Sequence, residues 1–193
     1  METSYLGNAG VFLVSTLFGL YILAVMLRML LAWVRADFYN PVSQFLVIIT
    51  NPALIPLRRV IPALGRLDTA ALVLLAGLET AKLLLIGVIV GNAFSATSLL
   101  ILAAADLLST VLNIYTFSII IQVILSWVAP HTYHPVASVL YQLNEPVLGP
   151  VRRVIPPLSG LDLSPLVVII GIQIAKMLVV APMTDIGWAA SLG

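Results

Sequence analysis

Residues 51–68 read NPALIPLRRVIPALGRLD, and residues 145–162 read EPVLGPVRRVIPPLSGLD. Prolines, adjacent arginines and a closing Leu-Asp recur at matching positions, and the match extends without a gap from Trp33 and Trp127 to Lys82 and Lys176. Self-similarity at one fixed displacement indicates a duplicated architecture. The sequence therefore predicts two copies of one unit, residues 1–94 and 95–193. The residues that define the repeat are Pro52, Pro56, Pro62, Asp68, Pro146, Pro150, Pro156 and Asp162.

The composition is that of a membrane protein. Hydrophobic residues make up 61% of the chain and charged residues 9%, and the mean hydropathy is +1.13, whereas a soluble domain carries about 25% charged residues. A bilayer core requires about 20 apolar helical residues, and a spanning helix pairs all its backbone groups internally. We predict an all-α membrane protein with transmembrane helices at 11–34, 69–90, 107–128 and 164–181. The apolar stretch 98–105 leaves open an earlier start of the third helix.

The loop charges predict an orientation in the membrane. Lysine and arginine are enriched in cytoplasmic loops, and both loops that contain the repeated stretch carry arginines, whereas the central connection 91–97 has no charge. We expect a multi-pass protein of the cell (inner) membrane, with both arginine loops cytoplasmic and both termini outside. Because two spans separate equivalent points, the copies are parallel repeats. The loop arginines are Arg35, Arg58, Arg59, Arg66, Arg152 and Arg153.

The P-x-x-x-P-x-R-R-x-I-P core with its following Leu-Asp resembles the YggT (YlmG-like) family of bacterial and plastid membrane proteins, as a two-copy member. The resemblance covers nearly the whole chain. It implies an association with osmotic or ion stress tolerance, with cell division and nucleoid distribution, or, in photosynthetic lineages, with maturation of cytochrome b6. None of these associations defines a chemical reaction.

The sequence of each arginine loop predicts interfacial helices. Asn40 and His134 precede a proline, which is favoured at the first helical position. In the second loop, Val136, Val139, Leu140 and Leu143 lie opposite Ser138, Gln142 and Asn144, so the helix is amphipathic. Asn51 and Pro52 predict a second cap and a helix restart, and the internal prolines predict a kink.

Two interpretations of the arginine pairs remain open. The first treats Arg58, Arg59, Arg152 and Arg153 as orientation markers paired with Asp68 and Asp162. The second makes them a site for anions or lipid headgroups, or for a docking partner, through bidentate phosphate contacts.

The spans also contain ionisable residues, which are costly in lipid and therefore have a partner or a cavity. Arg28 lies close enough to the predicted cytoplasmic edge to snorkel, and a structural role is the favoured interpretation for it. Glu79 and Lys82 are spaced for an intrahelical pair, and Lys176 leaves open a cluster with both of them. That cluster is either an ion or proton path or a structural network. For Asp106, near the outer end of the third span, an interfacial cap is adequate.

The chain carries no cysteine and no nucleotide-binding, zinc-protease or hydrolase motif. We expect no enzyme activity, no cofactor and no metal site. With a net charge of +1 we expect no nucleic-acid partner; the partners are membrane lipids, with a homo-oligomer and another membrane protein left open. The favoured function is a non-enzymatic scaffold, assembly or stress-tolerance factor acting through the arginine loops. The alternative is a small oligomeric ion channel or transporter in osmotic or ion homeostasis.

Overall fold

The computed structural model describes residues 5–65, 67–128, 134–155 and 162–191. This part of the chain is a series of helices joined by short connections. In chain order the helices are α1 (Tyr5–Trp33), α2 (Pro41–Val60), α3 (Thr69–Val90), α4 (Ala96–Val128), α5 (Pro135–Val154), α6 (Ser164–Ala175), the π-helical segment η1 (Lys176–Val180) and α7 (Ala181–Ala189).

Four helices in the described residues are long and apolar enough to cross a membrane, which confirms the predicted class. They are α1, α3, α4 and the continuous stretch Ser164–Ala189. In the most apolar window of each, only 11 to 28% of the residues are buried within the protein, so most of the span surface faces outward to lipid. The third span begins at Ala96, earlier than residue 107, and the fourth runs beyond residue 181.

The π-helical segment in the last span has a local cause in Pro182. A proline inside a helix has no N–H to donate, and its ring clashes with the carbonyl four residues earlier. Here that carbonyl belongs to Leu178, which lies within η1. Widening the helix to the π form accommodates the ring. In the first copy, Val88 occupies the equivalent position, and α3 is α-helical throughout.

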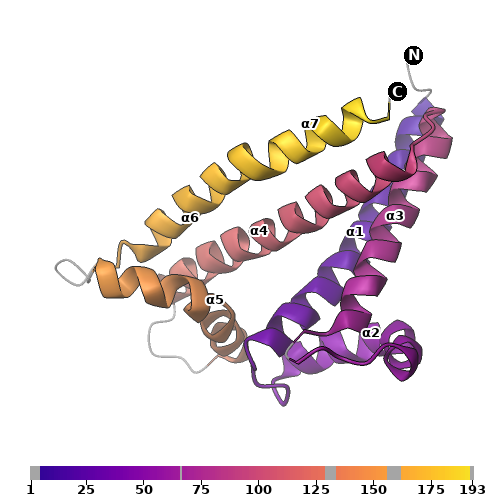
Figure 1. The fold of residues 1–193 in the computed structure, drawn as a ribbon. Coiled ribbons are helices and arrows are strands. Elements are labelled where there is room, and N and C mark those ends of the chain that lie inside the picture. Colours follow the sequence, from indigo (N-terminus) through magenta and orange to yellow (C-terminus); the bar gives the residue numbers. More distant parts are fainter. Residues whose placement is uncertain (1–4, 66, 129–133, 156–161, 192–193) are drawn as a thin grey trace.

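The spans form two arms that converge near the chain termini and spread apart toward α2 and α5 (Figure 1). One arm consists of α1 packed on α3, and the other consists of α4 packed on α6, η1 and α7. The helices α3 and α4, which are consecutive in the chain, also pack on each other and join the arms. We call the end where α2 and α5 lie the arginine side.

The loop helices differ from the prediction in one respect. Each is a single helix of 20 residues that continues through its two internal prolines, so the restart predicted at Asn51 and Pro52 is wrong. Both helices change direction along their length (Figure 1), as expected where prolines remove backbone hydrogen bonds. Asn40 caps α2 by accepting from the N–H of Val42 at 3.0 Å, whereas the His134 side chain makes no capping bond.

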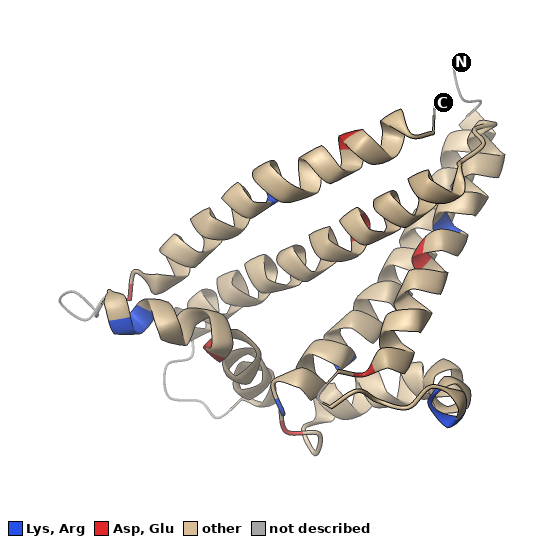
Figure 2. Cartoon of the chain, viewed as in Figure 1, with Lys and Arg blue, Asp and Glu red and all other residues tan. Residues whose placement is uncertain are grey.

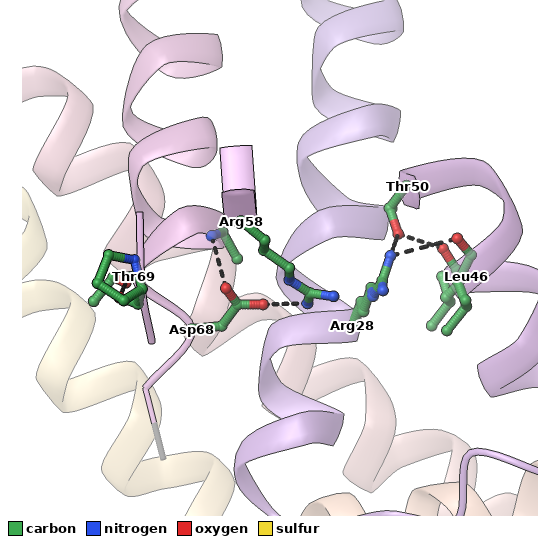
Figure 3. Close-up of polar contacts among 9 residues, drawn as sticks. Arg28, Leu46, Thr50, Arg58, Asp68 and Thr69 are labelled. Carbon is green, nitrogen blue, oxygen red and sulfur yellow. Dashed lines mark hydrogen bonds and ion pairs between the residues drawn. The ribbon is translucent and has the colours of Figure 1, made fainter. Parts of the chain in front are cut away.

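A buried polar contact ties each loop helix to the span before it. Arg28 of α1 is only 6% exposed and donates to Thr50 Oγ1 at 2.6 Å (Figure 3). In the second copy Gln122 of α4 accepts a 2.8 Å hydrogen bond from Asn144 Nδ2, and these two residues occupy the positions equivalent to Arg28 and Thr50.

The contact with Thr50 agrees with the structural role expected for Arg28, but the side chain does not snorkel toward water, because α2 covers it and supplies a hydrogen-bond acceptor. The prediction for Asn144 is wrong. Asn144, assigned to the polar outer face of its helix, is fully buried, and it also accepts from Ser118 Oγ at 2.6 Å. Both side chains turn inward because a neighbouring helix satisfies their polar groups.

Candidate functional site: the arginine side and the intramembrane charges

The first arginine of each pair fastens the end of a loop helix to the start of the next span. Arg58, in the last turn of α2, forms an ion pair with Asp68, and the same aspartate accepts from the N–H of Ala71 as the N-cap of α3 (Figure 3). Thr69 reinforces the corner by donating from Oγ1 to the Pro62 carbonyl at 2.6 Å. Arg58 is thus engaged within the protein.

The second copy repeats this corner with one addition. Arg152 Nε donates to Asp162 at 2.9 Å, and its Nη1 lies 3.2 Å from Glu145. Burial would raise the pKa of Asp162, but the N–H of Ser164 and the Arg152 guanidinium outweigh that effect and lower the pKa of this carboxyl. The carboxylate is therefore charged at neutral pH, and the pairing of each first arginine with the repeat's aspartate is confirmed.

The second arginine of each pair is exposed and engaged by no described residue. Arg59 and Arg153 make no ion pair or hydrogen bond within the described ranges. The arginine-bearing ends of α2 and α5 lie at opposite edges of the arginine side (Figure 2). Arg59 and Arg153 are therefore far apart, and the geometry does not gather the arginine pairs of both copies into one site.

The opposite ends of the two loop helices meet at the centre of the arginine side. Asn40 Nδ2 donates to the carbonyl of Pro135 at 2.8 Å, and the backbone N–H of Asp37 donates to Gln142 Oε1 at 2.7 Å. The loops of both copies thus form one platform, which consists of α2 and α5. Its two free arginines lie at its outer ends.

A second polar cluster lies inside the spans. Lys82 pairs with Glu79 one turn earlier on α3 and lies 3.3 Å from Asp106 of α4. Glu79 is only 1% exposed. A lysine therefore lies between two carboxylates, at the contact between the two copies.

Lys176, expected as a further member of that cluster, lies elsewhere. It donates from Nζ to Asn113 Oδ1 of α4 at 2.5 Å, within the second copy. The structure thus brings Glu79 and Lys82 together and adds Asp106, while Lys176 has a separate, neutral partner.

The role of Asp106 was missed, although the sequence contained a signal for it. Helices α3 and α4 are joined by a short turn, and in an antiparallel pair, residues equally far from the turn lie at equal depth. Lys82 lies eight residues before the end of α3, and Asp106 lies ten residues after the start of α4, so the two are at similar depth. Their opposite charges at similar depth predict the ion pair.

The repeat's prolines have different positions. Pro52, Pro56, Pro146 and Pro150 lie inside the loop helices, and Pro62 follows α2. Pro156, like Arg66, lies outside the described residues. Within the described ranges no group of His, Cys, Asp and Glu side chains is arranged to hold a metal ion.

Two tandem helical hairpins, each with a loop helix between its spans, define a duplicated four-span membrane protein. The family model described as CCB3/YggT matches residues 7–89 and again residues 101–183, a displacement equal to that between the two double-arginine stretches. The chain belongs to the CCB3/YggT family.

Relatives match over most of their length. An uncharacterized protein of Pseudomonas aeruginosa is 44% identical over 177 residues, 91% of this chain and 90% of the relative. A Vibrio alginolyticus protein, described by its position in the proC 3' region, is 43% identical over 174 residues, covering 89% and 93%. The uncharacterized protein YggT of Escherichia coli K12 is 36% identical over 173 residues, 88% of each chain. No solved structure matches the chain.

Proposed function

We propose that the protein is a non-enzymatic membrane scaffold whose platform of α2 and α5 binds anionic lipid headgroups through Arg59 and Arg153. The observation that carries this proposal is that the two arginines of each pair differ in their contacts. The first arginine is held by an aspartate, whereas the second is exposed and free of any described partner.

The free arginines have the chemistry that such binding requires. A guanidinium forms bidentate hydrogen bonds with phosphate, and a basic residue near an anionic leaflet contributes about 1 kcal/mol of attraction. The two positions are at opposite ends of the platform (Figure 2), so two headgroups bound there would fix its tilt against the membrane surface. A scaffold held in this way presents α2 and α5 to a partner in one orientation.

Replacing both free arginines tests the proposal. In Arg59→Gln/Arg153→Gln we expect the affinity for phosphatidylglycerol to fall about fivefold at each position, because about 1 kcal/mol is lost there. Energy transfer from the native tryptophans to pyrene-labelled phosphatidylglycerol in phosphatidylcholine nanodiscs measures the effect, since Trp33 and Trp127 lie at or next to the ends of α1 and α4. Salt should weaken the wild-type signal.

The matched control is Arg58→Gln/Arg152→Gln, which removes the same charge from neighbouring positions. We expect this control to lower the melting temperature, because it breaks both corner ion pairs, and to change phosphatidylglycerol binding less. Equal binding by wild type and Arg59→Gln/Arg153→Gln, both correctly folded, would overturn the proposal.

The second candidate function is ion or proton movement, and the cluster of Glu79, Lys82 and Asp106 favours it. Two carboxylates and one ammonium carry a formal net charge of −1 if all are ionised, which is costly within a bilayer. A proton or a monovalent cation would neutralise it. Because only four spans are present in the described residues, a conducting form would require several copies of the chain.

Glu79→Gln separates this candidate from a structural network. Glutamine is the residue at the equivalent position of the second copy, Gln173, and it preserves the shape of the side chain while removing the charge. If the cluster is a path, we expect the variant to lose proton or potassium flux in liposomes loaded with a pH dye or potassium. A fall in thermal stability with unchanged flux assigns the cluster to helix packing.

A further inference from the structure

An apolar cavity of about 530 Å³ lies between the two copies on the arginine side of the spans. Its lining residues come from α1, α2, α4 and α5, and α1 and α4 belong to the two arms that spread apart toward α2 and α5 (Figure 1). Its lining includes Leu23 and Leu27 of α1, Phe117 and Ile121 of α4, and Leu140 and Leu143 of α5. Both repeats therefore build it, and neither builds it alone.

The few polar side chains in the lining already have partners. Thr110 donates to the Asp106 carbonyl, and Ser118 donates to Asn144. The oxygen of Asn113 accepts from Lys176. The surface offered to an occupant is therefore almost entirely hydrocarbon, and an apolar cavity of this kind does not hold water. Polar solutes and hydrated ions do not fit this chemistry.

The platform limits what can enter. A partner's transmembrane helix needs about 30 Å of free path through the bilayer core, but Val42 and Leu46 of α2 and Leu140 and Leu143 of α5 close the cavity on the arginine side. The two platform helices are joined there by the Asn40–Pro135 hydrogen bond. An acyl chain ends within the bilayer and does not have to pass this floor.

We infer that the cavity is a binding site for an acyl chain of a membrane phospholipid, which fills the space between the two copies. Empty space of this size would forfeit the dispersion contacts of its lining. The lining includes the exposed side chains of Leu23, Phe117 and Ile121, so the cavity is open at the outer surface of the spans. The cavity would contact the acyl chain and not the headgroup, so this site is independent of the anionic-lipid binding proposed for Arg59 and Arg153.

Gly19 offers a way to fill the cavity from within. It lines the cavity, and a Cβ added to it meets no atom within 4 Å. Gly77 on α3 is equally open but is not among the cavity's lining residues, so Gly77→Phe is a matched control for Gly19→Phe. Leu140→Trp fills the same cavity from α5 and serves if the first variant does not fold.

The experiment uses the full chain in phosphatidylcholine vesicles containing phosphatidylcholine with a diazirine on one acyl chain. After irradiation, peptide mass spectrometry measures labelling at Leu27 inside the cavity and at Val88, which is 81% exposed on α3. We expect both to be labelled in wild type and in Gly77→Phe. In Gly19→Phe, or in Leu140→Trp, labelling at Leu27 should fall at least fivefold while labelling at Val88 stays unchanged.

Two results would overturn the inference. One is labelling at Leu27 that is no greater than background in wild type or is unchanged in both filling variants. The other is a shift from dimer to monomer in native mass spectrometry on filling the cavity, which would assign the space to a second copy of the chain. Because phosphatidylcholine is zwitterionic, neither result depends on the free arginines.

Discussion

Replacing Asn144 with leucine is expected to lower the free energy of unfolding by about 1 to 2 kcal/mol, through loss of two buried hydrogen bonds. Asn144 is fully buried between α5 and α4, where it donates to Gln122 at 2.8 Å and accepts from Ser118 at 2.6 Å. Leucine has a similar volume, so packing is nearly preserved while Gln122 loses its side-chain partner. Thermal unfolding in detergent measures the loss.

The first copy supplies the control. Thr50 occupies the position equivalent to Asn144, and Arg28 the position equivalent to Gln122. Asn144→Thr is expected to be destabilised, and Gln122→Arg/Asn144→Thr to recover part of the loss by recreating the Arg28–Thr50 contact. A double variant no more stable than Asn144→Thr would show that the contact between Asn144 and Gln122 does not hold α5 in place. An Asn144→Leu protein as stable as wild type would show the same.

The sequence was sufficient to predict the features of the fold that depend on a local pattern of residues or on the internal repeat. Hydropathy and length located the spans because lipid requires about 20 apolar helical residues. Self-comparison revealed the duplication, and the repeated aspartates indicated partners for Arg58 and Arg152. The cap at Asn40 followed from the residue type and from the proline after it.

Features that depend on two helices facing each other were not predictable in this way. The pattern of α5 placed Asn144 on the polar face, since periodicity shows only which residues share a face and not what lies opposite. Arg28 is buried because α2 folds back over it. The cavity likewise depends on the angle between the arms, which no single helix encodes.

The continuity of α2 and α5 has a similar explanation. Each internal proline removes one helical hydrogen bond and favours a break, as the sequence predicted at Pro52. Burial of Leu46 and Leu54, on either side of that proline, favours a helix that continues and bends. Tertiary packing therefore overrides a local breaking signal, and the helix reaches far enough to bring Arg58 to Asp68.

Replacing Gly87 with alanine is expected to destabilise the protein by about 1 to 3 kcal/mol, the usual cost of overpacking. A Cβ at Gly87 would lie 2.8 Å from the Asn92 carbonyl oxygen and 2.8 Å from the Phe94 ring. The turn wraps closely around Gly87, whose carbonyl accepts from the N–H of Asn92 at 2.9 Å. Gly91 makes this possible with its left-handed backbone, φ 73°.

The consequence reaches the charged cluster, because this turn sets the register of α3 against α4. Displacing the turn should lengthen the 3.3 Å contact between Lys82 and Asp106. Removing the Asp106 carboxylate should therefore cost less stability in Gly87→Ala than in wild type. A double-mutant cycle measures this difference. The control is Gly77→Ala on the same helix, where an added Cβ meets no atom within 4 Å and we expect no loss of stability. If Gly87→Ala melts at the same temperature as Gly77→Ala, the close packing of this turn does not determine how the two copies are joined.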